Sequence, residues 1–225
     1  MNIILLSGGS GKRLWPLSNE TMSKQFLRLL RNDKGEKESM VQRVFRQIKE
    51  ARIDANIVIA TGKSQVESIR SQLGQVDVVV EPERRNTFPA ILLASAYLKY
   101  EKNIDPEDSV IVLPVDPYAE NTYFETLLKM DEVIKLNSAD MTLMGIVPTY
   151  PSEKYGYIIT EKTDNEVKKV LKFQEKPSLE KAQELLAQGA YWNAGVFGFK
   201  LRYIINILDR NISVSSYDEL HKRFS

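Results

Sequence analysis

The residues best suited to chemistry lie in a glycine-rich segment near the start of the chain. Gly8, Gly9 and Gly11 fill three of four consecutive positions, and Lys12 and Arg13 follow directly. Glycine tolerates positive φ and close backbone approach, so successive N–H groups of such a loop can face an anion. An apolar run precedes the loop, which puts its basic pair at the carboxyl end of a buried strand, where α/β proteins bind ligands. The segment therefore predicts a phosphate site.

This loop matches neither of two familiar phosphate-binding patterns. A P-loop would need glycine at the position of Leu6 and serine or threonine at that of Arg13. The dinucleotide fingerprint, counted from Gly9, would need glycine at the position of Leu14. A tight turn after a strand is the simplest alternative, and it explains the glycines but not the two basic residues.

The composition narrows the chemistry further. The 225 residues contain no cysteine and a single histidine, His221, so a thiol nucleophile, a disulfide framework, an iron–sulfur cluster and a Cys/His zinc site are excluded. A Ser-His-Asp mechanism would depend on His221, for which a surface position on a terminal helix is the simpler interpretation. Catalysis must rely on carboxylates, lysine, arginine and backbone amides, with or without an oxygen-ligated metal.

Charge and hydropathy give expectations about partners and location. With 31 basic and 30 acidic residues the net charge is +1, so the chain lacks the excess of positive charge that indicates non-specific nucleic-acid binding. The N-terminal apolar run is short and lacks a basic region before it, and no other run approaches about 18 residues. We expect no signal peptide, no membrane span and a cytoplasmic protein.

The elements that must position these residues alternate along the first part of the chain. Five apolar runs fit strands buried on both faces: Ile3–Leu6, Ile57–Ala60, Val78–Val80, Val110–Leu113 and Thr142–Val147. Four segments between them have helical spacing: Ser39–Glu50, Ser64–Leu73, Thr87–Tyr100 and Asn121–Leu136. Ser39 and Gln42 form a capping-box pattern at the start of the first. This alternation predicts an α/β fold with a Rossmann-like, mostly parallel sheet flanked by helices.

The pattern changes after about residue 148. Tyr155–Ile159 and Val167–Phe173 fit antiparallel strands joined by a polar turn. A helix at Leu179–Leu186, a strand at Trp192–Phe199 and a helix at about Leu201–Leu208 follow, and the stretch 213–225 is polar and helical at most. No repeat or flexible linker interrupts the chain, so we expect a small antiparallel extension of the same sheet within a single domain, 1–225.

Six ordered motifs together resemble one enzyme family. The glycine loop continues as Leu14-Trp15-Pro16-Leu17-Ser18, and the other motifs are Lys24-Gln25-Phe26-Leu27, Glu81-Pro82 with Arg85-Asn86-Thr87, Val112–Asp116, Tyr155–Ile158 with Phe173–Pro177, and Trp192–Phe197. This set resembles the sugar-1-phosphate nucleotidyltransferases, with mannose-1-phosphate guanylyltransferase as the nearest branch. That branch typically reads GSGTRLWPLS and PKQF; in this chain Lys12 replaces the threonine and Ser23 the proline.

The resemblance implies a reaction and a fold of the nucleotide-diphospho-sugar transferase type. In that reaction mannose 1-phosphate attacks the α-phosphorus of GTP, pyrophosphate leaves and GDP-mannose forms with the help of Mg²⁺. The attacking phosphate is already an anion, so no general base is needed, which agrees with a chain almost without histidine. The resemblance also assigns residues 1–148 to a nucleotide-binding half and 149–225 to an incomplete sugar-binding half.

The resemblance gives individual residues of the first half a role. Arg13 and Lys24 would neutralise the triphosphate, and Asp116 would be the metal ligand. The other nucleotide-binding residues would be Leu6, Gly8, Gly9, Ser10, Gly11, Lys12, Glu81, Arg85, Asn86, Thr87 and Ala90. Taken alone, Lys24 could be a solvated lysine and Asp116 a turn or helix cap. Pro117 stands where the family usually has histidine.

Four residues of the second half receive a role toward the sugar phosphate. Lys176 would bind the phosphate, Glu175 and Asn193 the hydroxyls, and Gly156 would let the backbone approach the ring. Taken alone, Glu175-Lys176-Pro177 is a weak motif that an exposed ion pair before a turn would also explain. Trp192 is expected in the core rather than at the ligand.

Two function classes remain open from the sequence. In the family a second metal-binding aspartate lies downstream of all six motifs and beyond the position of Ser225, so we expect this chain to fold and bind nucleotide but to turn over poorly. The leading hypothesis is a guanylyltransferase; the alternatives are a non-catalytic nucleotide- or nucleotide-sugar-binding module and a pyrophosphorylase for another sugar (GDP-heptose, or a UDP- or dTDP-sugar). The expected partners are GTP and a sugar 1-phosphate, with no nucleic acid or membrane and a possible homo-oligomer.

Overall fold

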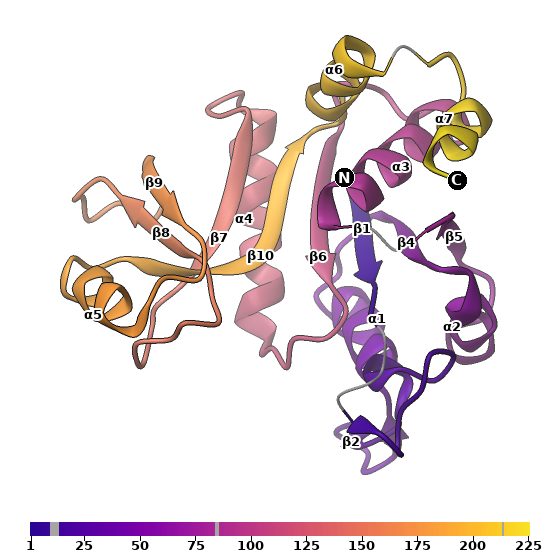
Figure 1. Ribbon diagram of the computed structural model, residues 1–225, viewed down its shortest axis with the longest axis horizontal. Helices are drawn as coiled ribbons and strands as arrows, with labels where there is room; N and C mark the ends of the chain where they lie inside the picture. The colour runs from indigo at the N-terminus through magenta and orange to yellow at the C-terminus, as the bar shows by residue number, and fades with distance from the viewer. Residues whose placement is uncertain (10–13, 84–85, 213) are drawn as a thin grey trace. The chain divides into compact units, whose positions relative to one another are not determined.

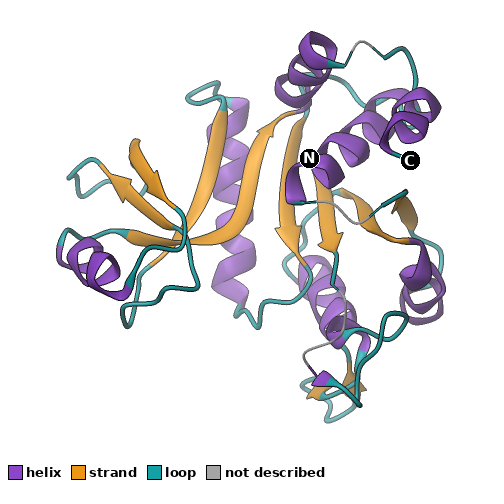
Figure 2. Ribbon diagram, in the orientation of Figure 1, coloured by secondary structure: helices purple, strands orange, loops and turns teal. Residues whose placement is uncertain are grey.

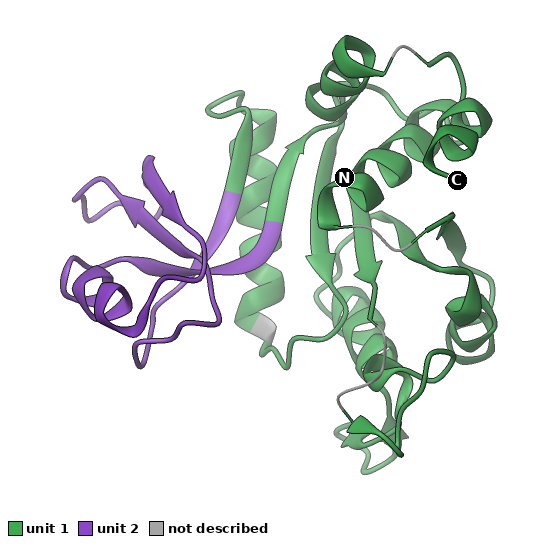
Figure 3. Ribbon diagram, viewed as in Figure 1, with its two compact units in different colours: residues 1–142, 197–225 green, residues 143–196 purple. Residues whose placement is uncertain are grey.

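The computed structural model describes residues 1–9, 14–83, 86–212 and 214–225. Its residues form two compact units (Figure 3). Unit 1 comprises Met1–Thr142 and Phe197–Ser225, and unit 2 comprises Leu143–Val196. Within the described residues, no helix is long and apolar enough to cross a membrane.

The sheet of unit 1 is centred on strand β1 (Figure 1). Its four parallel strands follow the order β5-β4-β1-β6, and their bounds are β1 Asn2–Ser7, β4 Asn56–Gly62, β5 Asp77–Glu81 and β6 Ser109–Pro114. The last residues of β10 (Tyr191–Lys200) add to β6 in the antiparallel direction, with Phe197 opposite Val112. The parallel sheet predicted from the alternating apolar runs is confirmed.

Helices cover both faces of this sheet (Figure 2). Helix α3 (Thr87–Tyr100) packs on β1, β4 and β5 and also contacts α6 (Leu201–Asn211) and α7 (Tyr217–Phe224). It is therefore covered on opposite sides, which explains why its apolar residues surround the whole helix instead of forming one stripe. On the other face α4 (Asn121–Lys135) packs on β6, and α1 (Met40–Glu50) contacts both α4 and α2 (Val66–Leu73).

The strands distribute their side chains between these two layers. Ile4, Val58 and Val110 belong to the core cluster that contains the buried residues of α3. Because side chains alternate along a strand, the fully buried Ile3 and Leu5 face the layer of α1 and α4. Both faces of β1 are thus buried, as expected for a central parallel strand.

Local sequence signals explain the helix ends. Ser39 caps α1 through a capping box: its side chain accepts from the Gln42 N–H, and the Gln42 side chain accepts from the Ser39 N–H. Helix α3 spans the predicted residues 87–100. The sequence missed the short hairpin of β2 (Leu30–Arg31) and β3 (Lys37–Glu38), whose strands are too short for a periodic pattern.

Unit 2 is a small antiparallel assembly with a core of its own. Strand β8 (Tyr157–Thr160) pairs with β9 (Val170–Gln174) and with Tyr191 and Trp192 of β10. Helix α5 (Leu179–Ala187) contributes Ala182 and Leu185 to a cluster around the fully buried ring of Tyr157. The Tyr157 hydroxyl also accepts a hydrogen bond from the Ser152 N–H and donates one to the Ser152 carbonyl.

The end of the chain differs from the expected division into halves. Residues 197–225 were expected with the sugar-binding half, but they belong to unit 1. The reason is non-local: Phe197–Lys200 pair with β6, and α6 and α7 pack on α3. Thr142, at the other boundary of unit 1, lies beside Gly198 and donates a hydrogen bond to its carbonyl at 3.4 Å.

One strand prediction was wrong in its burial. The run Thr142–Val147 was expected to be buried on both faces; it forms β7 (Met141–Ile146), but within that strand only Met144 is buried. Among the described strands β7 pairs with β10 alone, so it lies at a sheet edge. Apolar composition identified the strand correctly but could not reveal its place in the sheet.

Candidate functional site

The carboxyl ends of three neighbouring strands bring the predicted residues of unit 1 together. Leu6 of β1 lies opposite Ala60 of β4 and Pro114 of β6. The Val115 N–H donates to the Leu6 carbonyl at 3.2 Å, so the two chain segments leave the sheet side by side. The glycine loop follows β1 and Asp116 follows β6, which places both at the same edge of the parallel sheet.

Lys24 and Asp116 form the central contact of this edge. The Nζ atom of Lys24 lies 3.1 Å from Oδ2 of Asp116, although the residues are 92 positions apart in the sequence. Their side chains keep 44% and 52% exposure, so both remain accessible to a ligand. Lys24 begins the short 3₁₀ helix η2 (Lys24–Phe26), which Phe26 anchors by near-complete burial. Lys24 thus has one specific partner, Asp116, and its role toward a triphosphate stays a prediction.

The segment after Asp116 is fixed by helix α1. The side-chain amide of Gln47 donates to the Ala119 carbonyl at 2.9 Å within the core. The guanidinium of Arg43 lies 4.3 Å from the ring centroid of Tyr118, a cation–π contact. Burial raises the pKa of the nearby Tyr123 phenol, and the negative charge of Asp116 raises it further. Tyr123 is therefore a neutral neighbour of the carboxylate.

A buried polar cluster lies beneath the start of the glycine loop, and the sequence analysis gave its members no role. Ser7, Gln25, Thr61 and Gln65 are each at most 4% exposed. The Thr61 hydroxyl donates toward the Ser7 carbonyl at 3.0 Å, and the Gln65 amide donates to the Gly9 carbonyl at 2.8 Å. Polar residues at the end of an apolar strand were the available signal for Thr61, but nothing in the sequence pointed to Gln65.

Further predicted nucleotide-binding residues lie at and after the carboxyl end of β5, the strand next to β4. Glu81 is the last residue of β5, and it pairs with Gly62 at the end of β4. Asn86 is the N-cap of α3 but makes no capping bond with its side chain, Thr87 is the first helical residue, and Ala90 is 5% exposed. The burial of Ala90 limits it to a packing role or a backbone contact.

Five of the predicted residues, Ser10, Gly11, Lys12, Arg13 and Arg85, lie outside the described residues. Gly8 and Gly9 are described and exposed, and a Cβ on Gly8 would meet nothing within 4 Å. The predictions for the anion-binding loop therefore stay predictions, supported at Gly8 by an open backbone.

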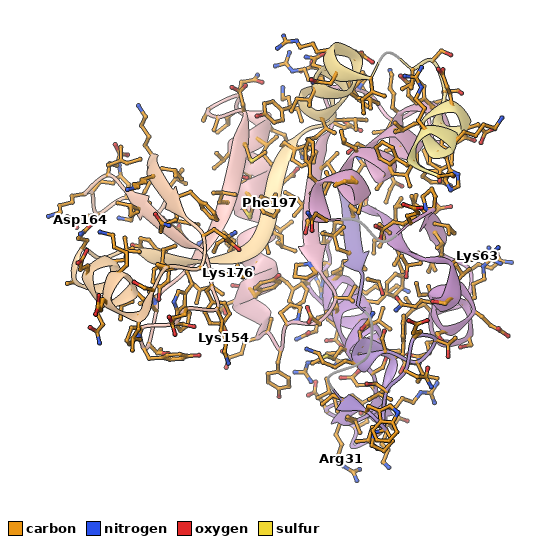
Figure 4. All side chains as sticks on the ribbon, in the orientation of Figure 1. Arg31, Lys63, Lys154, Asp164, Lys176 and Phe197 are labelled. Atoms are coloured by element: carbon orange, nitrogen blue, oxygen red, sulfur yellow. The ribbon has the colours of Figure 1, made fainter. Side chains whose placement is uncertain are left out.

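Unit 2 brings its four predicted residues into one place. The Asn193 N–H donates to the Gly156 carbonyl at 2.8 Å. A Cβ on Gly156 would lie 2.8 Å from a carboxylate oxygen of Glu175 and 2.7 Å from the ring of Phe173, so any other residue would force both side chains to shift. Glu175 in turn forms a 2.9 Å ion pair with Lys176, which is labelled in Figure 4. These contacts join positions spread over 38 residues of the chain.

The backbone of this cluster is unusual at two positions. Lys176 has φ +37°, in the left-handed region that non-glycine residues seldom adopt, and Gly195 has φ +72°. The Asn193 side chain accepts from the Gly195 N–H at 3.1 Å, which holds that turn. Strained non-glycine residues concentrate at functional sites, where the surrounding structure holds them. Lys176 thus begins its side chain from an unusual backbone conformation, while its ammonium stays exposed to solvent.

Trp192 packs against the core cluster of unit 2 that contains Tyr157. Its ring is only partly buried and meets Tyr150 and Tyr155, with ring centroids 5.0 and 4.7 Å away. Its indole nitrogen is buried, and no described group bonds to it. Phe199 is 1% exposed and does belong to the core.

At the carboxyl edge of the unit 1 sheet, the acidic side chains offer a metal ion few ligands. Among the described residues no group of three or more acidic or histidine side chains could hold one. Asp116 nevertheless attracts a cation, because the Lys24 ammonium contacts its carboxylate. One accessible carboxylate fits Mg²⁺, which is commonly held by one or two carboxylates together with substrate phosphates. The residues present are compatible with a metal that arrives with the nucleotide.

Comparison with known proteins decides the family. Residues 2–216 match the family described as Nucleotidyl transferase. The chain belongs to the nucleotidyl transferase family. A mannose-1-phosphate guanylyltransferase of Escherichia coli is 32% identical over 215 residues, and the xanthan biosynthesis protein XanB of Xanthomonas campestris is 37% identical over 211 residues. Each match covers 89% of this chain, so the family predicted from the six motifs is confirmed.

A solved structure extends this nucleotidyl transferase likeness to the fold. The structure from Thermus thermophilus named a mannose-1-phosphate geranyltransferase has a TM-score of 0.82 at 26% identity, and the match covers 99% of this chain and 67% of that one. The predicted nucleotide-diphospho-sugar transferase fold is confirmed. The present chain spans 44% of the length of the Escherichia coli relative and 42% of the Xanthomonas relative.

Proposed function

We propose that this nucleotidyl transferase forms GDP-mannose and pyrophosphate from GTP and mannose 1-phosphate. The observation that carries the proposal is the Lys24–Asp116 pair beside the glycine loop, at the carboxyl edge of the sheet where α/β proteins bind ligands. The mannose-1-phosphate guanylyltransferases among the relatives favour guanine and mannose.

The bond changes in this reaction require little from the protein beyond placement and charge. An oxygen of mannose 1-phosphate forms a bond to the α-phosphorus of GTP, and the bond from that phosphorus to the bridging oxygen of the β-phosphate breaks. The electron pair leaves with pyrophosphate, and no proton has to be removed from the attacking group. Catalysis then consists of aligning two mutually repelling anions and neutralising their charge.

Residues of unit 1 are assigned to the triphosphate. Backbone amides at the glycine loop would bind phosphate oxygens, and Lys24 and Arg13 would neutralise them. Asp116 would hold Mg²⁺, which when bound supplies further positive charge at the phosphates. Lys24 would exchange its contact with Asp116 for one with phosphate when both ligands enter.

Residues of unit 2 are assigned to mannose 1-phosphate. Lys176 would bind its phosphate and Glu175 its hydroxyl groups, since a carboxylate accepts several hydrogen bonds. Gly156 would allow close approach of the sugar ring. The left-handed backbone of Lys176 supports this role, because strained non-glycine residues concentrate at functional sites.

The experiment is pyrophosphate release by the purified chain with GTP, mannose 1-phosphate and Mg²⁺, alongside ATP, UTP and dTTP and other sugar 1-phosphates. Release with GTP and mannose 1-phosphate above every other pair is expected. Preference for UTP or dTTP would contradict the guanylyl assignment.

A second function has one observation in its favour. Among the described residues, no group of three or more acidic or histidine side chains surrounds Asp116, the proposed metal ligand. A nucleotide-binding module without turnover would have such a site. Calorimetry that detects GTP binding, together with no pyrophosphate release, would establish this alternative.

A further inference from the structure

Gln65 is a fully buried amide that joins three separate segments of unit 1. It ends the short 3₁₀ helix η3 (Lys63–Gln65), directly after β4, and has 0% exposure. Its Nε2 atom lies 2.8 Å from the Gly9 carbonyl in the glycine loop and 3.1 Å from the Ser23 hydroxyl. The Glu20 carbonyl lies 3.4 Å from the same nitrogen.

Hydrogen-bond chemistry fixes the orientation of this amide. The carbonyls of Gly9 and Glu20 can only accept, so the NH₂ end of Gln65 must face them. The Oε1 end then accepts from the Gln25 amide at 3.5 Å and lies 3.0 Å from the Thr61 hydroxyl, whose single proton goes either to this oxygen or to the Ser7 carbonyl. Both ends of the side chain are therefore engaged, and rotating the amide would bring two carbonyl oxygens against its oxygen.

The segments joined by Gln65 carry the proposed triphosphate contacts. Gly9 belongs to the anion-binding loop, and Ser23 immediately precedes Lys24. Ser23 is completely buried and makes no capping bond to η2, so its hydroxyl is available to Gln65. Gln25, on the other side of Lys24, packs against Gly9, since a Cβ on that glycine would lie 3.6 Å from its side-chain oxygen.

We propose that Gln65 and Ser23 are positioning residues that set the distance between the glycine loop and Lys24. This inference rests on the proposed function, because the positioned groups are those assigned to the triphosphate. Misplacement of a charged contact by about 1 Å costs on the order of 10²-fold in rate.

The main variant is Gln65→Glu, which keeps the size of the side chain but removes the NH₂ donor. The introduced carboxylate would face the Gly9 and Glu20 carbonyls, so the loop and the Lys24 segment should separate. The matched control is Asn2→Asp, an equally buried amide at the opposite end of β1 that donates to the Ser109 carbonyl at 3.2 Å. Both substitutions place a carboxylate in the core, so both should lower the melting temperature.

The readout is a dissociation constant for GTP, measured by calorimetry on the full chain, together with KM values for both substrates. Gln65→Glu should weaken GTP binding about tenfold or more, as expected when a buried carbonyl loses its donor. The KM for mannose 1-phosphate should change less than about twofold, because the residues assigned to that substrate lie in unit 2. Asn2→Asp should bind GTP with the affinity of the unchanged protein, even if its melting temperature falls as much as that of Gln65→Glu.

A milder variant keeps the proposal testable where Gln65→Glu does not fold. Ser23→Ala removes one hydroxyl and should weaken GTP binding between about two- and tenfold. Unaltered GTP affinity in folded Gln65→Glu or Ser23→Ala protein, or equal losses for both substrates, would overturn the positioning role while leaving the proposed function intact. Absence of GTP binding in the unchanged protein would overturn both.

Discussion

The two groups of predicted residues, one in unit 1 and one in unit 2, are held in place by opposite means. In unit 1 Lys24 and Asp116 are exposed, but buried amides hold the segments next to them. Gln65 bonds to Ser23, which precedes Lys24, and Gln47 bonds to the Ala119 carbonyl, which follows Asp116. In unit 2 the side chains of Glu175 and Lys176 are more than half exposed, and the constraints lie in the close packing at Gly156 and in the left-handed backbone of Lys176.

The difference indicates where each site tolerates change. A site supported by hydrogen bonds fails when a donor is lost, because a buried acceptor is left without a partner. A site fixed by backbone conformation and close approach fails when volume is added. Substitutions that remove atoms should therefore damage unit 1 most, and substitutions that add atoms should damage unit 2 most.

The largest effect is expected for Lys24→Ala. Loss of one preorganised charged donor typically lowers the rate by ~10²–10³. Stability should change little, because the ion pair is about half exposed and such pairs contribute little. The measurement is kcat for pyrophosphate release beside a thermal melt. The matched control is Lys102→Ala, which breaks a 2.7 Å pair with Asp77 of similar exposure on edge strand β5 and should leave the rate unchanged.

Gly156→Ala should produce the largest effect in unit 2. The new methyl would overlap the Phe173 ring and a Glu175 oxygen, and a displacement of about 1 Å can cost on the order of 10²-fold. The specificity constant for mannose 1-phosphate should fall by about that factor, while GTP binding stays within about twofold because its residues lie in unit 1. Adding Phe173→Leu should restore part of the loss; no restoration would mean that the overlap with Phe173 is not the cause.

Lys176→Ala should have a smaller effect, confined to one substrate. Loss of the proposed phosphate contact should raise the KM for mannose 1-phosphate about tenfold, which corresponds to a charge-assisted hydrogen bond. Lys172→Ala on β9 is the control, because it removes a neighbouring exposed charge. A parallel loss of GTP affinity of the same size would show that Lys176 has another role.

The smallest effect on activity is expected for Ser39→Ala, which tests the scaffold of unit 1 alone. It removes the N-cap of α1 and should lower the free energy of unfolding by about 1 kcal/mol. The rate of pyrophosphate release should remain unchanged, as checked at a temperature well below the melt. A loss of activity in folded protein would connect α1 more closely to Asp116 than its contacts with Tyr118 and Ala119 indicate.

Local signals in the sequence predicted most elements of the fold. The capping box of Ser39 and Gln42, the uniformly apolar α3 and the Ile/Val-rich strands all depend on neighbours within a few positions. The sequence could not predict that residues 197–225 belong to unit 1, because this placement depends on pairing between β10 and β6, which are distant in the sequence.

The same distinction applies to the candidate site. Motifs identified Lys24, Asp116 and the four residues of unit 2, since each lies in a recognisable segment. Gln65 was missed because its partners Gly9 and Ser23 lie 56 and 42 positions away, and a single glutamine carries no pattern. The left-handed backbone of Lys176 was equally invisible, because nothing in its residue type requires it.

The hydrogen bond between Thr142 and Gly198 has an evolutionary consequence. The chain leaves unit 1 after Thr142 and re-enters it at Phe197, and these two points lie close together in space. Segments whose ends lie close together can be exchanged or inserted without rebuilding their host. Residues 143–196 thus have the topology of a cassette. Replacing that cassette with its counterpart from a relative would change unit 2 without rebuilding the sheet of unit 1.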